Sequence, residues 1–149
     1  MIDTLIEKGY IIKLSPDIKK SENSIRLAEN SIGRAQVEFD ADIYDGAFLS
    51  AYTAMFHCAR SLLFKDGFKE KNHYALYAYL SLAYVGKIDK KYINELNNFR
   101  TIRHKIIYGD EEVHIREVQE TEAHSAINIA AGFLESVKKL IHQNDKVKK

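Results

Sequence analysis

The sequence predicts an all-α protein, an antiparallel up-down four-helix bundle with an additional short helix. Three observations support this prediction. The 149 residues include one proline and seven glycines, too few to separate many short strands. Apolar residues recur every three or four positions over long segments, which is the spacing of helices. The connections between these segments are short, so consecutive helices are expected to run antiparallel.

The first third of the chain is expected to hold a short arm and a long helix. Residues 3–10 are predicted to form a short helical turn or arm. Ser15-Pro16-Asp17 is typical of a helix start, with serine as the capping residue and proline in the first helical position. From Ile18 to Phe39 apolar residues keep helical spacing, which predicts an amphipathic helix of about six turns.

The next segment, residues 43–66, is apolar on two faces and ends before Gly67. A helix that is apolar on most sides is usually buried on most sides, so we expect the central helix here. It contains Cys58, the only cysteine, which we expect in the core. A single cysteine excludes an internal disulfide and zinc sites built on cysteine pairs.

Three further helices are expected after Gly67. The first, which Asn72 can cap, runs from His73 to about Val85. The second runs from about Lys90 to Ile107 and is followed by a turn at 108–112. The last runs from Ile115 to Gln143, where apolar residues alternate steps of four and three in the manner of a bundle seam.

The helices account for most of the length, and we expect residues 1–149 to form one domain. Its core is expected at about residues 18–141, followed by a frayed, lysine-rich tail through Lys149.

The charge is balanced in total but uneven along the chain. A net charge of +1 argues against a surface coated in basic residues. However, 87–105 is locally basic and 110–122 is acidic. No apolar segment is long enough to span a membrane, and the N-terminus lacks a signal-peptide pattern. We therefore expect a cytoplasmic protein without membrane association.

The candidate site is the segment from Arg100 to Asp110, where polar groups interrupt an apolar helix. Arg103 enters a row that is otherwise apolar. Arg100 and Arg103 are three positions apart, so both could contact a phosphate, with Lys105 nearby. The alternative is that the arginines pair with acids such as Glu111 or with a second copy of the chain.

The sequence predicts no metal site and no cofactor. His114 and His124 are ten positions apart, without a third ligand at a useful spacing. There is no Gly-rich phosphate loop, no nucleophile elbow and no distinct pair of carboxylates.

Two segments resemble the signatures of small stand-alone HEPN domains. The first is Ala-Tyr-Thr-Ala-Met-Phe-His-Cys-Ala-Arg-Ser-Leu-Leu at 51–63, followed by Gly67 and Lys-Asn-His at 71–73. The second is Arg103 through Tyr108-Gly109. The resemblance covers about residues 18–141. It implies an all-α bundle that forms a homodimer, and a minimal nucleotidyltransferase as partner in a toxin–antitoxin pair.

The resemblance also implies the chemistry of the site. Many HEPN domains are metal-independent ribonucleases that use an arginine, a polar residue directly after it and a histidine a few residues later. Arg103 and His104 match the first two positions, but Tyr108 occupies the position of the histidine. Free histidine has a pKa near 6.5, whereas about one free tyrosine in a thousand is ionised at pH 7. Tyrosine is therefore a poor general base.

Three functions remain open at this point. The first is a module that binds the nucleotidyltransferase and RNA or a nucleotide through Arg100, Arg103 and Lys105. The second is a metal-independent ribonuclease with Arg103, His104 and Tyr108 as catalytic residues. In the third, the partner modifies Tyr108 with a nucleotide. In the first signature, His57 and His73 are expected to be structural residues, with His57 satisfied inside a packed helix.

Overall fold

The computed structural model of the chain describes residues 1–109 and 116–147, with side chains described as far as His142. Within these residues it contains six helices and two short strands. They are α1 (Ile2–Glu7), β1 (Ile11–Lys13), α2 (Ile18–Asp40), α3 (Tyr44–Asp66), β2 (Phe68–Glu70), α4 (His73–Ala83), α5 (Lys90–Tyr108) and α6 (Glu120–Val147). The predicted all-α class is confirmed. No helix of the described chain is both long and apolar enough for a bilayer.

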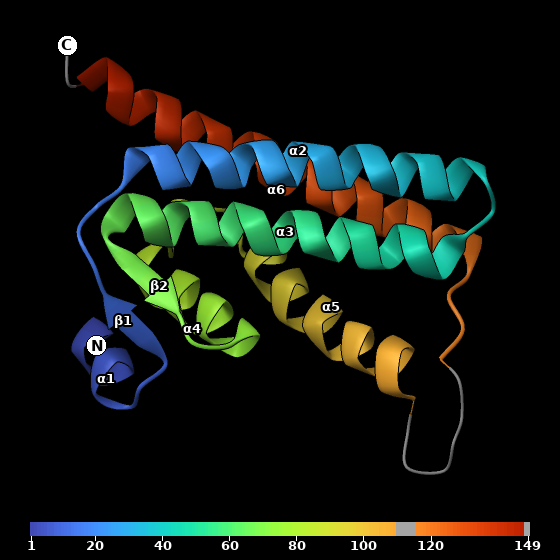
Figure 1. Cartoon of the computed structure of the whole chain (residues 1–149), viewed down its shortest axis with the longest axis horizontal. Coiled ribbons are helices and arrows are strands. Elements are labelled where there is room, and N and C mark those ends of the chain that lie inside the picture. Colours follow the sequence, from blue (N-terminus) through green and yellow to red (C-terminus); the bar gives the residue numbers. More distant parts are fainter. Residues whose placement is uncertain (110–115, 148–149) are drawn as a thin grey trace.

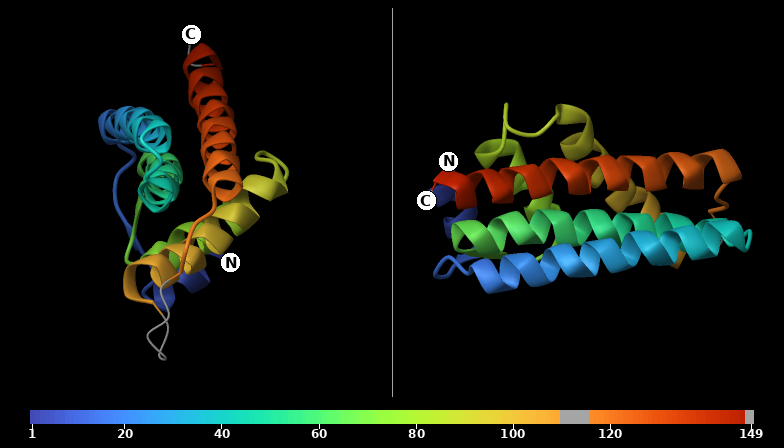
Figure 2. Two further views of the ribbon diagram at one scale, coloured as in Figure 1. Left: turned by 90° about the vertical axis from the view of Figure 1, so that its right-hand side faces the viewer. Right: turned by 90° about the horizontal axis from the view of Figure 1, so that it is seen from above.

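Helix α3 is at the centre of the molecule. It runs antiparallel to α2, and the two lie side by side (Figure 1). Helix α6 packs against both, while α5 and α4 contact α3 at an inclination to the long helices (Figure 2). The two-faced apolar pattern of 43–66 thus predicted the central helix correctly, because α3 has neighbours on several sides.

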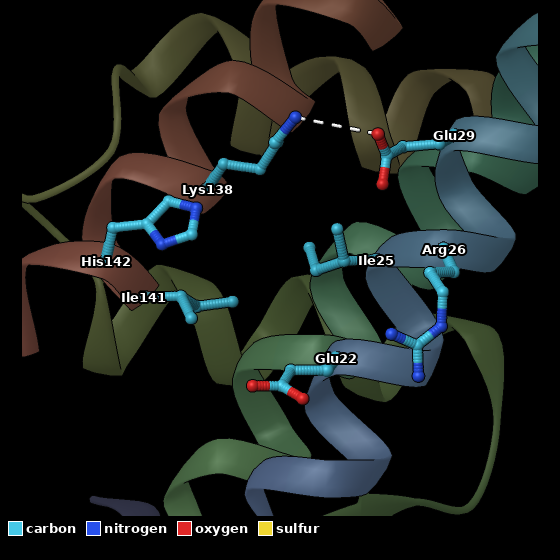
Figure 3. A pocket seen from close by; sticks show the side chains of 7 residues that line it. All are labelled: Glu22, Ile25, Arg26, Glu29, Lys138, Ile141 and His142. Atoms are coloured by element: carbon cyan, nitrogen blue, oxygen red, sulfur yellow. Dashed lines mark ion pairs between the residues drawn. The ribbon is translucent and has the colours of Figure 1, made fainter. Parts of the chain in front are cut away.

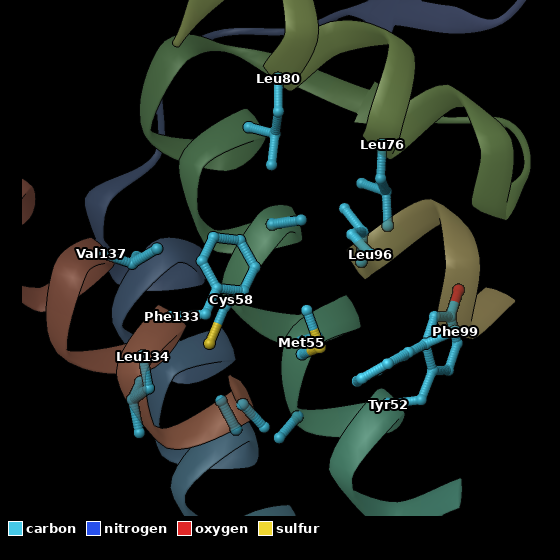
Figure 4. Packing of buried hydrophobic residues seen from close by; sticks show 14 of the residues in the cluster. Tyr52, Met55, Cys58, Leu76, Leu80, Leu96, Phe99, Phe133, Leu134 and Val137 are labelled. Atoms are coloured by element: carbon cyan, nitrogen blue, oxygen red, sulfur yellow. The ribbon is translucent and has the colours of Figure 1, made fainter. Parts of the chain in front are cut away.

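The core forms where α3 meets α4, α5 and α6. Met55 and Cys58 of α3 are fully buried, as are Leu80 of α4 and Phe133 of α6 (Figure 4). Burial of a large apolar side chain contributes about 1.5–3 kcal/mol. The burial of Cys58 agrees with the prediction and raises the pKa of its thiol, because the thiolate would be desolvated.

Two helix starts differ from the predictions. Helix α2 is capped by Asp17 instead of Ser15, since the Asp17 carboxylate accepts a hydrogen bond from the Lys20 N–H (3.0 Å). Helix α6 begins at Glu120, later than the predicted start at about Ile115, and residues 116–119 before it are not helical. The predicted turn at 110–112, Ile115 itself and the end of the tail at 148–149 lie outside the described residues.

Strands β1 and β2 were not predicted, because three residues are too few to show an alternating pattern. They pair antiparallel, with Ile11 opposite Glu70. Beside them the Leu14 N–H donates to the carbonyl of Gly67 (2.7 Å). Gly67 has a φ of 91°, and a Cβ there would meet the Leu14 carbonyl at 3.0 Å. The N-terminal arm is thereby joined to the connection between α3 and α4.

Candidate functional site

Helix α5 carries the predicted site and is held against α3 by its apolar face. Asp89 caps the helix by accepting a hydrogen bond from the Lys91 N–H (3.0 Å). Leu96 and Phe99 are buried, and the ring of Phe99 lies 4.9 Å from that of Phe48 in α3. These contacts fix the rotation of α5 about its axis. They therefore determine which of its polar residues face α3.

Arg103 follows Phe99 by four positions and faces the same side. Its guanidinium lies 5.9 Å from the ring of Tyr52, a cation–π contact with α3. Arg100 lies over a different ring, 5.5 Å from Tyr74 of α4, and also donates to the Asn97 side chain (3.0 Å). The arginine in the apolar row is thus accommodated by a buried aromatic ring beneath its charged group.

His104, Lys105 and Tyr108 are on the exposed part of α5. Tyr108 is 68% exposed, and its ring is 4.8 Å from that of His104, one turn earlier. One position along a helix is a rotation of about 100°, which separates His104 from Arg103. The structure therefore divides the predicted catalytic residues into Arg103, which faces α3, and an exposed His104–Tyr108 pair. Glu111, the predicted alternative partner of the arginines, lies outside the described residues.

His73, for which a structural role is expected from the sequence, lies one side chain away from Arg103. Its Nδ1 is 2.8 Å from the hydroxyl of Tyr52, and the two rings are stacked 5.8 Å apart. The ring of Phe56 is 4.6 Å away on another side. Tyr52 and His73 are far apart in the sequence, so only the packing of α4 on α3 brings them together. The one local signal was the capping Asn72, which places His73 at the start of α4.

Burial and the nearby arginines determine the protonation of this cluster. Desolvation lowers the pKa of His73, and the positive charge of Arg103 lowers it further. His73 is therefore mostly neutral at pH 7. Desolvation raises the pKa of Tyr52 to about 12, an effect that Arg103 opposes. Tyr52 therefore keeps its hydroxyl proton at neutral pH.

Arg60 and Glu70 form an ion pair next to the cluster. Arg60 Nε donates to Glu70 Oε1 (2.6 Å) and Nη2 to Oε2 (3.2 Å), a bidentate arrangement. The Arg60 guanidinium also lies 4.6 Å from the Phe56 ring. The Glu70 side chain is 4% exposed and that of Arg60 is 29% exposed. The pair thus connects α3 to β2 and leaves part of the guanidinium accessible.

His57 differs from its prediction as a satisfied residue. Its Nδ1 is buried, and none of the described residues gives it a hydrogen-bond partner. Desolvation, followed by the charge of Arg60, lowers the pKa of His57. The neutral form is the one that burial without a partner tolerates best.

Two cavities of about 230 Å³ each are relevant to ligand binding. One lies between α2 and α6, where Lys138 Nζ is 3.6 Å from Glu29 Oε2 (Figure 3). Two acids and two cations line it, so its charge is balanced. The other is lined by Arg60, Glu70 and His73, among others. Within the described chain, no group of three His, Cys, Asp or Glu side chains is arranged for a metal ion.

Comparison with known proteins agrees with the all-helical fold. A family model described as HEPN domain matches residues 21–140. A protein of Methanocaldococcus jannaschii, named as a putative toxin, is 28% identical over 133 residues. That alignment covers 87% of this chain and 96% of the relative.

Proposed function

This chain belongs to the HEPN domain family, and from that premise we propose that it is a toxin-like protein that binds RNA phosphates through its Arg100–Tyr108 segment. In this proposal it forms a homodimer and pairs with a minimal nucleotidyltransferase. The name of the relative from Methanocaldococcus jannaschii supports the toxin-like part, and the match covers nearly the whole of both chains.

The observation that carries the proposal is the position of Arg103. Its guanidinium rests on the buried Tyr52 ring, so its orientation is restricted before any ligand binds. The guanidinium fork is permanently charged and matches the geometry of a phosphate. The exposed Lys105 and the aromatic ring of Tyr108 lie further along the same helix. Cations beside exposed aromatic rings are suited to single-stranded RNA, whose bases can stack on the rings.

Binding is favoured over cleavage because α5 lacks a suitable base facing Arg103. Cleavage of RNA without a metal requires a group that accepts the 2′-hydroxyl proton near neutral pH. Tyr108 occupies the position of the family's histidine, and it is exposed instead of facing Tyr52 with Arg103. Ordinary tyrosine is protonated at pH 7 and does not accept this proton readily.

Metal-independent cleavage of RNA is the second candidate function. The contact between the rings of His104 and Tyr108 favours it, since both rings are accessible to an RNA strand on the surface of α5. In this candidate mechanism His104 accepts the 2′-hydroxyl proton while the 2′-oxygen bonds to phosphorus, and Arg103 stabilises the charge on the phosphorus centre. The bond from phosphorus to the 5′-oxygen then breaks; Tyr108 donates a hydrogen bond to this oxygen, which takes up a proton from water. The exposed hydroxyl of Tyr108 also suits modification by the partner enzyme.

RNA binding is tested by fluorescence anisotropy with a labelled single-stranded RNA in the presence of EDTA. We expect Arg103→Ala to weaken binding about tenfold, the equivalent of one charge-assisted contact of about 1.4 kcal/mol. The matched control is Arg34→Ala, which removes an exposed arginine from α2. Equal affinities for the wild type and Arg103→Ala would contradict the proposal.

The same reactions, resolved on a denaturing gel, test the second candidate. Cleavage that disappears in Arg103→Ala and in His104→Ala would support catalysis, whereas intact RNA would exclude it. Co-expression with a nucleotidyltransferase followed by gel filtration tests the partner. Mass spectrometry after addition of ATP tests modification of Tyr108, with Tyr108→Phe as the control.

A further inference from the structure

The cavity next to His73 is separate from the exposed face of α5. It lies between α3, β2 and the start of α4, and no residue of the Arg100–Tyr108 segment lines it. Its volume is about 230 Å³. Pockets for drug-sized ligands begin at about 300 Å³. The cavity therefore has room for a group the size of a phosphate.

The charge of the lining selects an anion. Arg60, Lys69 and Lys71 are cationic, and Glu70 is the one carboxylate among the described residues that line the cavity. Three positive groups and one negative group leave a net charge of two positive units. The Glu70 carboxylate is buried and already bonded to Arg60 through two hydrogen bonds, so it repels an incoming anion less than an unpaired acid would. Lys69 and Lys71 are exposed and available.

The inner wall is already organised. The Phe56 ring holds the Arg60 guanidinium at 4.6 Å and the His73 imidazole at 4.6 Å. Glu70 fixes the orientation of Arg60, and Tyr52 fixes that of His73. A ligand that binds these two groups therefore loses little free energy to side-chain ordering.

The hydrogen bond with Tyr52 also determines which nitrogen of His73 carries the proton. The Tyr52 hydroxyl is protonated and buried, and in the described chain its hydrogen-bond partner is His73 Nδ1 (2.8 Å). The hydroxyl therefore donates to Nδ1, which places the proton of the neutral imidazole on Nε2. His73 thus has an N–H donor for an anion in the cavity.

We propose that this cavity binds a phosphate monoester, such as the terminal phosphate of an RNA strand or a mononucleotide. Arg60, Lys69, Lys71 and His73 supply the donors and the positive charge. A monoester carries up to two negative charges, which matches the net charge of the lining. The inference depends on the proposed function only where the phosphate is the end of an RNA strand.

The side chains of His73 and Tyr52 would couple the ligand to the α5 site. His73 binds the Tyr52 hydroxyl, and the Arg103 guanidinium lies over the same tyrosine ring. An RNA end held in the cavity is therefore adjacent to the arginine proposed to bind the strand.

The test measures the affinity of the full chain for two RNA hexamers that differ in a 5′-phosphate or a 5′-hydroxyl. We expect the phosphorylated hexamer to bind about tenfold more tightly. The double variant Lys69→Ala/Lys71→Ala should abolish this difference, while the control Lys19→Ala/Lys139→Ala, which removes exposed lysines from α2 and α6, should retain it. In parallel, AMP and inorganic phosphate are titrated while the His73 imidazole signals are followed by NMR.

The outcomes separate this inference from the proposed function. Saturable His73 shifts with AMP, without RNA binding, would support the cavity with a mononucleotide as its ligand and contradict the RNA proposal. RNA binding that depends on Arg103 but not on the 5′-phosphate, with His73 signals unchanged by AMP and phosphate, would overturn the cavity inference and leave the proposed function standing.

Discussion

The ion pair between Arg60 and Glu70 should contribute measurably to stability, and the structure allows its magnitude to be worked out. Loss of one partner of a fully buried pair costs about 3–5 kcal/mol. The Glu70 side chain is 4% exposed, but Arg60 is 29% exposed, so water partly solvates the guanidinium when its partner is removed. We therefore expect Glu70→Ala to lower the free energy of unfolding by about 2–3 kcal/mol, which is less than for a fully buried pair.

For a chain of this length, each kcal/mol corresponds to about 2–4 °C in the melting temperature. Glu70→Ala should therefore lower the melting temperature by about 5–10 °C. The interaction itself is isolated by a double-mutant cycle of Arg60→Met and Glu70→Gln in urea. We expect a coupling energy of about 2 kcal/mol, since the two hydrogen bonds are charge-assisted and one partner is buried.

A less buried ion pair in the same chain provides the control. Arg116 and Glu122 are also bonded side chain to side chain, but they are 32% and 28% exposed. The cycle of Arg116→Met and Glu122→Gln should give a coupling of about 0–1 kcal/mol. A coupling below about 0.5 kcal/mol for Arg60 and Glu70, or one equal to that of the control pair, would show that burial of Glu70 does not strengthen the pair.

Three further predictions concern stability and protonation. Gly132→Ala should destabilise the protein by about 1–2 kcal/mol, because its Cβ would lie 2.3 Å from the Tyr92 hydroxyl. A Cβ added at Gly33 would meet no atom within 4 Å, so Gly33→Ala should stabilise α2 by about 0.5–1 kcal/mol. Thermal melts of the two glycine variants test both expectations. The pKa values of His57 and His73 are lowered in the folded chain. Below about pH 6.5, the pKa of histidine in the unfolded chain, the unfolded chain therefore binds more protons than the folded chain does. The contribution of the two histidines to stability is thus complete above about pH 6.5 and falls on acidification. The midpoints of urea unfolding at pH 7.5 and at pH 5.5 should therefore differ less in the double variant His57→Gln/His73→Gln than in the wild type. Tyr52→Phe should cost about 1 kcal/mol and release His73 from its single tautomer, and ¹⁵N NMR that finds the same tautomer in both proteins would contradict the assignment of the hydrogen bond.

Periodic patterns predicted the long helices well, because burial on one or more faces requires apolar residues at fixed intervals. Asn72 was also identified correctly as the cap of α4, and Cys58 as a core residue. The Ser15 cap was wrong, since Ser15 and Asp17 both fit a helix start. The Asp17 N–H donates to the carbonyl of Phe64 in α3 (2.9 Å). Because this partner is distant in the chain, the local sequence around Asp17 does not reveal the contact.

The site was predicted only in part, for the same reason. The segment 100–110 was selected because polar groups interrupt an apolar helix, and this indicated Arg103 correctly as an unusual residue. Helix geometry alone separates His104 from Arg103 by about 100°, but the pattern along one helix could not indicate that Arg103 faces Tyr52. Nor could it place His73 beside Tyr52, because that contact depends on how two helices pack.

The pairing of β1 with β2 has a consequence for folding. It joins residues separated by the whole of α2 and α3, so on its own it would have to close a long loop. The antiparallel hairpin of α2 and α3 first brings the two ends of this loop together, because its contacts are formed between neighbouring helices. We therefore expect the strands to pair after the hairpin and to open before it, so amide hydrogens at Ile11 and Glu70 should exchange faster than those in the middle of α3. Glu70 and Lys69 belong to this late-forming strand, and the cavity should therefore be among the first parts of the molecule to be lost under mild denaturation.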